Sequence, residues 1–558
     1  MHDLIIRGAR IVDGTGAPAF MGDVAVAGGR IVEVTRSGRD APPAAARRVV
    51  DAGGRLLTPG FVDIHTHYDG QVCWDKQVTP SAWHGVTTVV TGNCGVGFAP
   101  VRRGGEQALI DIMESVEDIP AKALGTGLPW NWESFAEYLA SIDTPYAVDV
   151  GTQVPHVAVR LYVMGERAYG EATADDIARM AAVTREALDA GALGFSTSRF
   201  HGHLDKHGRE IPGTHAGADE MLAIGAAIAG SARGTIELIS DRLTDPAEQA
   251  WIESLARLTG RPVTILCASE TGPELWEMAE RLNAAGLRIR PQIGARTSSV
   301  IMTLDGTVNP MRPYPSYGAI RHLPVEEQRR QLLDPQFRAR ILADTPKVAR
   351  YASTERMLST WDRMYVLSPA LDYEPGYADS LAGIAAARGI HVREALMDAM
   401  GHGRPLLWLF GDYPGNLERQ RIGIEHPLSV FGLADGGAHS GSLADASMPT
   451  YMLAYMCRDR TKGPRMSLEF VVHKMTADAA RVYGLNDRGA IAPGLRADLN
   501  LIDYDALALN DPYVAFDFPS GAKRMVQSAR GYDLTLCNGI VTYERGTHTG
   551  AMPGRLLR

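Results

Sequence analysis

Long apolar runs are missing from the sequence: no stretch reaches the roughly 18 apolar residues that a membrane-spanning helix needs. The first residues, "MHDLIIRGARIVDG", contain no basic segment followed by a long apolar one, so we expect no secretory signal. Cysteine is scarce as well, and the five cysteines are an odd, scattered set that fits no disulfide framework. These absences predict a cytoplasmic protein without a membrane span.

An excess of basic charge is also missing. The chain has 56 Lys and Arg against 65 Asp and Glu, and its formal net charge is -9. Nucleic acids and anionic membranes attract basic clusters, so we expect a partner of neither kind. At 558 residues, with 45% hydrophobic and 22% charged residues, the chain can bury a large core. This composition indicates an enzyme-sized globular protein, and it leaves assembly into a homo-oligomer open.

The pattern of predicted elements changes twice along the chain. Residues 1–56 and 486–558 contain short strand-like segments separated by glycine turns. Residues 57–485 alternate apolar strands with longer helical segments, which predicts an α/β fold with a (β/α)8 TIM-type barrel. Because each terminal segment is too short to be stable alone, we expect the two to form one small β-sandwich domain.

Eight candidate strands can be located in the middle region. They cover residues 60–67, 85–95, 146–156, 191–198, 234–241, 261–269, 287–294 and 430–439. One helix between them is well marked, since Thr173 can cap it, Asp175 and Asp176 lie in its first turn and Gly191 can end it.

Residues with metal-binding chemistry stand at the ends of three of these strands. His65 and His67 are two apart and therefore share a face of the first strand, Cys94 ends the second and Asp435 the eighth. Each has a simpler interpretation alone: a surface histidine pair, an inert buried cysteine and a turn aspartate. Because active-site residues of such barrels gather at the carboxyl ends of the strands, their joint placement predicts a divalent metal site, with zinc favoured.

Several motifs carry a family resemblance. "LLTPGFVDIHTHYDG" (56–70) resembles the first metal motif of the amidohydrolase superfamily, and "GVTTVVTGNCGVGFAP" (85–100) is similar to the cysteine-bearing strand of its D-aminoacylase branch. "GLADGGAH" (432–439) resembles that branch's final barrel strand, and "RGAIAPGLRADLNLID" (488–503) its return to the small β domain. The resemblance spans almost the whole chain and implies a zinc-dependent hydrolase of N-acyl-D-amino acids.

The resemblance also implies residue roles. His65 and His67 would hold one zinc, and Cys94 would replace the carboxylated lysine of other superfamily members. Asp435 would ligate or lie beside the metal, accept a proton from the attacking water and pass it to the leaving amine. The metal would lower the pKa of the water and polarise the substrate carbonyl.

The sequence departs from the branch at two metal positions. D-aminoacylases carry histidines on strands five and six, where this chain has Ile239 and Cys267. We therefore expect one tightly held metal and not two. The missing ligands could be replaced by Cys267, by Glu237 or Asp241 on the face of Ile239, or by a histidine of the insertion "SRFHGHLDKHGREIPGTH" (198–215).

A second departure concerns the substrate. The branch grips the carboxylate of the amino acid with an arginine after strand eight and a tyrosine after strand seven. No arginine follows Asp435 closely here, so Arg296, after strand seven, is the candidate for this contact. His201 in the insertion and His439 after strand eight are further candidates for binding a small amide substrate.

Three functions compete. The leading one is hydrolysis of a linear amide such as an N-acyl amino acid, and the second is hydrolysis of a cyclic amide or ureide, an ester or a toxin amide at the same site. The third is a non-catalytic scaffold, which would have no need of the complete set His65, His67, Cys94 and Asp435.

Overall fold

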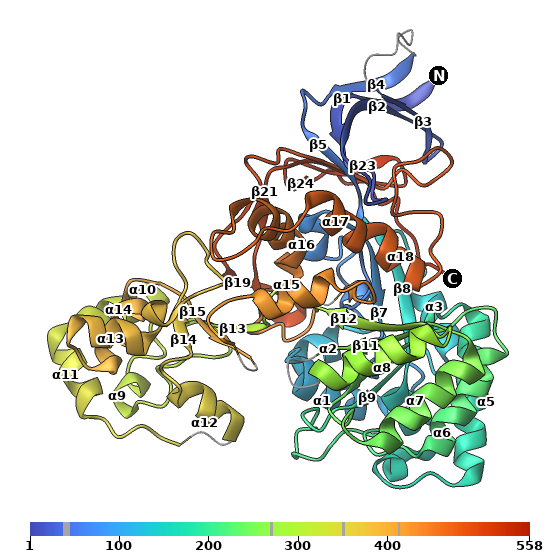
Figure 1. Ribbon diagram of the computed structural model, residues 1–558. Helices are drawn as coiled ribbons and strands as arrows, with labels where there is room; N and C mark the ends of the chain where they lie inside the picture. The colour runs from blue at the N-terminus through green and yellow to red at the C-terminus, as the bar shows by residue number, and fades with distance from the viewer. Residues whose placement is uncertain (37–44, 268–271, 349–351, 411–412, 433) are drawn as a thin grey trace.

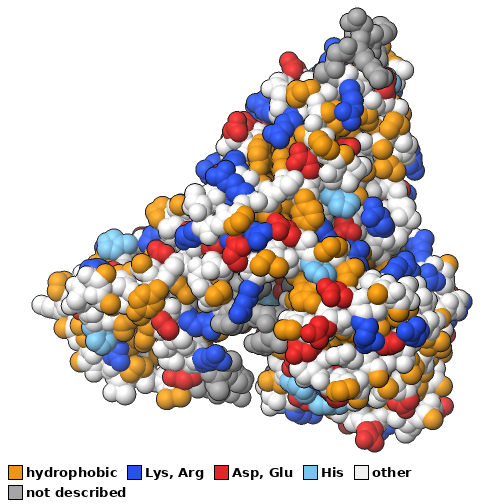
Figure 2. Space-filling view, in the orientation of Figure 1, with side chains coloured by type: hydrophobic (Ala, Val, Ile, Leu, Met, Phe, Trp, Pro, Cys, Tyr) orange, Lys and Arg blue, Asp and Glu red, His pale blue; other side chains and the backbone are white. Residues whose placement is uncertain are grey.

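The computed structural model describes residues 1–36, 45–267, 272–348, 352–410, 413–432 and 434–558. Figure 1 shows three bodies: a β domain that contains the N-terminus at the top, a strand-and-helix body at lower right and a mostly helical lobe at the left. None of the helices in the described residues is both long and apolar enough to cross a membrane. On the face drawn in Figure 2, acidic and basic side chains are interspersed.

The central body is built on an eight-stranded, TIM-like parallel sheet whose spatial order follows the sequence. Its strands are β6 Phe61–Asp63, β7 Val86–Thr91, β8 Asp149–Pro155, β9 Gly194–Arg199, β10 Thr235–Ser240, β11 Val263–Leu266, β12 Ile289–Ile293 and β16 Val430–Phe431. A parallel bridge joins Thr66, just after β6, to Gly436, just after β16, so the two outer strands meet at their carboxyl ends. All eight predicted strands are present, the eighth only over Val430–Phe431; residues 268–269 of the sixth and 433 of the eighth lie outside the described residues.

Helices connect successive strands and cover the outside of the sheet (Figure 1). They are α1 Glu106–Glu117, α2 Ala121–Gly127, α3 Phe135–Ile142, α4 His156–Met164, α5 Ala174–Ala190, α6 Ala218–Ala229, α7 Pro246–Thr259 and α8 Gly272–Ala284. The predicted helix is α5: the Thr173 side chain accepts a hydrogen bond from the Asp176 amide, the Asp176 side chain bonds back, and Gly191 ends the helix. This reciprocal pair satisfies amides that the first helical turn leaves free.

Both ends of the chain contribute to one nine-stranded sheet, in the order β24-β23-β22-β17-β5-β1-β2-β3 with β4 beside β1. Its strands are β1 His2–Ile11, β2 Phe20–Ala27, β3 Arg30–Arg36, β4 Ala46–Asp51, β5 Leu56–Pro59, β17 Leu499–Ile502, β22 Tyr532–Cys537, β23 Ile540–Glu544 and β24 Thr547–His548. The junction is the antiparallel pairing of β5 with β17, in which Leu57 lies opposite Leu501. The predicted pairing of the two terminal segments is therefore present.

Buried ion pairs hold this sheet against the central body. Asp149, on β8, accepts from Arg488 Nη1 at 2.5 Å and from Arg496 Nη2 at 2.8 Å. All three side chains are almost completely buried, so the two guanidinium groups compensate for the desolvation of the carboxylate.

A lobe that the sequence did not predict is inserted between β12 and α15 Glu418–Glu425, which precedes β16. It contains the antiparallel strands β13 Ser299–Met302, β14 Met364–Val366 and β15 Leu406–Leu409 and the helices α9 Pro315–Gly318, α10 Val325–Leu333, α11 Pro335–Ala343, α12 Ala352–Ser359, α13 Leu381–Arg388 and α14 Val392–Gly401. Met302, Leu332 and Leu396 belong to a hydrophobic core of its own. At its base Glu374 accepts from buried Arg460, which joins the lobe to the segment after β16.

Candidate metal centre

The histidine pair lies just beyond the end of β6, where the chain is held from both sides. The Thr66 amide donates to Val90 O at 3.1 Å, and the His67 amide donates to Gly436 O at 2.7 Å. His65 and His67 are completely buried, and their ring centroids are 5.4 Å apart. The backbone on each side thus fixes both imidazoles inside the mouth of the sheet.

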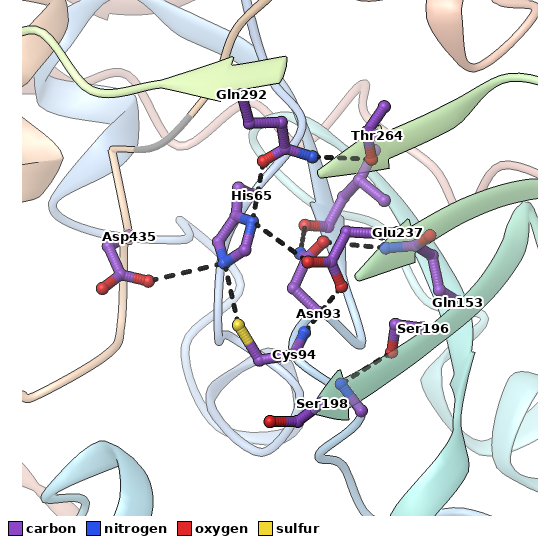
Figure 3. A network of polar contacts seen from close by, with 12 residues as sticks. His65, Asn93, Cys94, Gln153, Ser196, Ser198, Glu237, Thr264, Gln292 and Asp435 are labelled. Carbon is purple, nitrogen blue, oxygen red and sulfur yellow. Dashed lines mark hydrogen bonds and ion pairs between the residues drawn. The ribbon is translucent and has the colours of Figure 1, made fainter. Parts of the chain in front are cut away.

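Cys94 and Asp435 point at the His65 imidazole (Figure 3), and Asp435 also lies beside His67. Cys94 Sγ lies 3.4 Å from His65 Nε2, and Asp435 Oδ1 lies 3.8 Å from His65 Nε2 and 3.3 Å from His67 Nε2. One donor atom from each of His65, His67 and Cys94 falls within 4.8 Å of the other two. The structure therefore brings the four predicted metal residues together.

The backbone at this site is held in an unusual conformation. Cys94 has φ 52° and Asp435 has φ 54°, in the left-handed region that residues with a Cβ seldom adopt. Each such residue costs about 1–3 kcal/mol, and such residues concentrate at functional sites. The strain is therefore an independent sign that these two positions serve chemistry.

The ring of His65 is oriented by polar side chains of neighbouring strands. Its Nδ1 is 3.0 Å from Gln292 Oε1 on β12, and Gln292 Nε2 donates to Thr264 Oγ1 at 2.9 Å (Figure 3). Since the amide nitrogen of Gln292 is engaged, its oxygen accepts from His65 Nδ1–H. In this tautomer Nε2 carries no proton, and its lone pair faces Cys94 and Asp435, where it can bind a metal ion.

Two buried glutamates complete the surroundings. Glu237 Oε2 accepts from the Cys94 amide at 2.8 Å, and its Oε1 lies 4.0 Å from His65 Nδ1. Glu117, the last residue of α1, places Oε1 3.5 Å from His67 Nδ1. An acidic residue at a helix C-terminus interacts unfavourably with the helix dipole. A buried glutamate at that position therefore indicates a local requirement for negative charge.

The electrostatics of the cluster show the effect of crowded negative groups. Burial, with the charges of neighbouring carboxylates, raises the pKa of Glu237 to about 8 and that of the Cys94 thiol well above its usual value. Burial would lower the pKa of His67, but Glu117 and Asp435 outweigh it and raise that pKa to about 10. Burial would raise the pKa of Asp435, but His67 and His65 hold it well below its ordinary value.

Several buried polar atoms in the site also lack a hydrogen-bond partner among the described residues. They include Asp63 Oδ2, Asp69 Oδ2, His67 Nδ1 and Glu237 Oε1. An unpaired buried polar atom is costly, and a surplus of acceptors in one place is best compensated by a cation. Imidazole, thiolate and carboxylate donors together suit zinc, so the residues present fit a divalent metal ion.

The predicted substrate-binding residues lie around this cluster and not within it. Arg296 is buried, donates to Asp445 Oδ1 at 2.9 Å and lies over the Tyr373 ring at 4.1 Å. His439 is partly exposed, with Nε2 4.0 Å from Glu117 Oε2. His201 lies on the exposed rim.

One insertion histidine reaches the interior. His203 Nδ1 is 2.8 Å from Ser198 Oγ, and the pKa of His203 is lowered to about 3 by burial and by the nearby charges of His439 and His67. The sequence offered no way to separate His203 from its three loop neighbours. The sequence also did not single out Glu117 and Gln292 from other residues of their types. A glutamine inside the apolar strand "IRPQI" was nevertheless a usable signal.

Comparison with known proteins agrees with this geometry. A family model described as the amidohydrolase family matches residues 48–543. The chain is 30% identical to N-acyl-D-aspartate deacylase of Alcaligenes xylosoxydans xylosoxydans, covering 100% of this chain and 95% of that one. The chain belongs to the amidohydrolase family. The resemblance seen in the motifs is thereby confirmed.

Two further proteins match this amidohydrolase over nearly their full lengths. D-aminoacylase of Alcaligenes xylosoxydans xylosoxydans is 28% identical, with 100% of this chain and 97% of that one covered. A solved structure of N-acyl-D-glutamate deacylase from Bordetella bronchiseptica, complexed with zinc and a phosphonate inhibitor, matches with a TM-score of 0.65 at 24% identity, covering 100% of this chain and 99% of that one. At that identity the structural match establishes the shared fold.

Gln292 provides a test of how this amidohydrolase orients the His65 imidazole. Replacing Gln292 with Leu removes the acceptor for His65 Nδ1–H, so we expect metal affinity to fall about 10- to 100-fold, as is typical when such a supporting partner is lost. Competition with a coloured chelator measures the affinity. Gln249→Leu on α7, where the amide bonds only the Leu243 carbonyl in the described contacts, is the matched control. Equal affinities in both variants would contradict the orienting role.

Proposed function

We propose that this amidohydrolase hydrolyses the amide bond of an N-acyl amino acid, with preference for the D configuration. The observation that carries the proposal is the convergence of buried His65, His67 and Cys94 with partly buried Asp435 at the carboxyl ends of the strands. The names of its relatives, deacylases of N-acyl-D-aspartate and N-acyl-D-glutamate and a D-aminoacylase, supply the substrate class.

The same four residues would hold one zinc ion. When bound, such an ion lowers the pKa of a water molecule and polarises the carbonyl of the substrate. A second tightly held ion is not part of the proposal, because Ile239 and Cys267 stand where the branch has histidines. Asp241 lies at the rim beside His201, and burial raises the pKa of the Cys267 thiol to about 11.

Asp435 performs the proton transfer in this proposal. Its pKa lies well below the ordinary value, so its carboxylate is ionised at neutral pH and can accept a proton from the attacking water. The same proton then goes to the amide nitrogen as the carbon–nitrogen bond breaks, and the products are a carboxylic acid and an amine. Gln292 and Glu117 keep the His65 and His67 rings in place during this exchange.

Arg296 is the proposed contact for the substrate carboxylate, with His439 and His201 as further contacts at the mouth. The Arg296 side chain is buried, and its Nε and Nη1 have no hydrogen-bond partner among the described residues. An arginine with two free N–H edges suits bidentate binding of a carboxylate. Its partner Asp445, whose pKa is raised to about 6 by burial, holds the guanidinium from the other side.

The proposal is tested with an assay panel on zinc-loaded protein. We expect turnover of N-acyl-D-amino acids, at least tenfold slower turnover of the L isomers and none of cyclic ureides. Arg296→Lys should raise KM about 10-fold or more for a substrate with a free α-carboxylate, because the planar fork is lost, and change KM little for the matching carboxamide. Turnover of cyclic ureides alone would favour the alternative function, and inactivity on all substrates would favour the scaffold.

Three further features belong to the proposal. Residues 57–485 would form a closed (β/α)8 barrel, and residues 1–56 and 486–558 together a side domain of sandwich form. The five cysteines are all free, and the Cys94 thiol must stay reduced to bind metal, which supports a cytoplasmic location.

A further inference from the structure

A second group of metal-binding side chains lies in the β9–α6 loop, residues 200–217. Two of its histidines converge on one carboxylate: His201 Nδ1 is 2.6 Å from Glu210 Oε1, and His215 Nε2 bonds Glu210 Oε2. The two imidazole rings are 5.6 Å apart. The two oxygens of Glu210 are thus each bonded by a histidine, one nine positions and one five positions away along the chain.

A fourth residue, Asp241, contacts His201 from its other side. Asp241 directly follows β10, and its Oδ2 accepts from the His201 amide at 3.1 Å. Its Oδ1 lies 3.8 Å from His201 Nε2 and is a buried atom without a hydrogen-bond partner among the described residues. An acceptor without a partner in the described part of the chain therefore lies beside the group and comes from the segment after β10, not from the loop itself.

The chemistry of the group points to a metal ion. One donor atom each from His201, Glu210 and His215 lies within 4.8 Å of the others, a set separate from that of His65, His67 and Cys94. Two imidazoles with carboxylates form a common zinc donor set. The three side chains are 46%, 32% and 62% exposed, so a hydrated ion can reach them and keep some of its water.

We propose that His201, Glu210 and His215 form a second site for a divalent transition metal such as zinc, separate from the catalytic centre. The ion would tie these three side chains of the loop to one another, and Asp241, directly after β10, would hold His201 from its other side. The same loop carries His203, whose ring reaches Ser198 beside the catalytic cluster. The site is therefore structural: it holds the loop that forms one wall of the catalytic mouth.

Metal counting on the full-length protein tests the proposal without using hydrolysis as the readout. Equilibrium dialysis against zinc at about pH 7.5, where unperturbed imidazole is mostly neutral, should give one equivalent beyond those held by the catalytic centre. His215→Ala should bind this equivalent at least 10-fold more weakly. His207→Ala, which removes an exposed histidine of the same loop outside the group, should bind it as the native chain does. Identical zinc binding curves for the native chain and His215→Ala would overturn the proposal.

A second measurement needs no variant. Lys206 and Arg209 are exposed trypsin sites inside the loop, with side chains 47% and 57% accessible. Zinc should slow cleavage at both sites at least threefold and should shield His201 and His215, but not His207, from chemical acylation read by mass spectrometry. If zinc changes neither the cleavage rate nor the modification of His201 and His215, hydrogen bonds alone hold the group together and the proposal is wrong.

Discussion

We expect Asp435→Asn to slow hydrolysis of an N-acyl amino acid by about 10²- to 10⁴-fold, the usual contribution of a positioned acid and base. The substitution keeps the size of the side chain and one oxygen beside His65 and His67, so much of the metal affinity should survive. The amide that replaces the carboxylate cannot accept a proton at neutral pH. Turnover is measured at matched metal occupancy, together with binding of a competitive inhibitor, which should change much less.

The leaving group separates proton transfer from a purely structural role of Asp435. An amide nitrogen must be protonated as it departs, whereas an activated ester departs without a proton. The variant should therefore lose less activity on the ester than on the amide. Equal losses on the two substrates would show that Asp435 only ligates or shapes the site.

His65→Ala would remove a proposed metal ligand, and we expect both metal content and turnover to fall by more than the roughly 10- to 100-fold that a supporting residue costs. The thermal unfolding curve of metal-free protein should change little, since residues beyond the strand ends lie outside the packed interior layers of such a sheet. Metal analysis after dialysis against a mild chelator gives the content.

Two further variants are compared with His65→Ala: Cys94→Ser changes a second proposed ligand, and His207→Ala is the control. Cys94→Ser keeps the approximate size of the side chain but replaces the soft sulfur atom next to His65 Nε2, so metal affinity should also drop sharply. His207→Ala, in the exposed loop, should leave the tightly held metal in place. Full metal and full turnover in His65→Ala would mean that the histidine pair does not form the catalytic centre.

The parts of the fold that could be predicted are those with a local signal. Strand β10, for example, is a buried run "TIELIS" bounded by glycine and a turn, and α5 carries its cap residues in the sequence. The placement of His65, Cys94 and Asp435 followed from one geometric rule, that the carboxyl ends of parallel strands meet at one face. No long-range contact had to be known to bring these residues together.

The missed features depend on contacts between distant segments. Glu117 reaches His67 from a helix that lies about 50 residues further along the chain, and its helix gives no periodic sign of that contact. The inserted lobe buries Met302 against segments such as α14, so its core forms from pieces that are individually short and ambiguous. The partner of Arg296, Asp445, lies about 150 residues away and was equally invisible.

The pairing of β5 with β17 has a consequence for how the protein is made. Leu57 and Leu501 lie side by side in the finished sheet, yet about 440 residues separate them along the chain. At roughly 5–20 residues per second, a ribosome takes about 20 to 90 seconds to synthesise that interval. During this time β1 to β5 can pair with one another, but the β17 edge of β5 stays open to other chains. Slower translation or a shortage of chaperones should therefore raise aggregation of the nascent chain before it affects the finished enzyme.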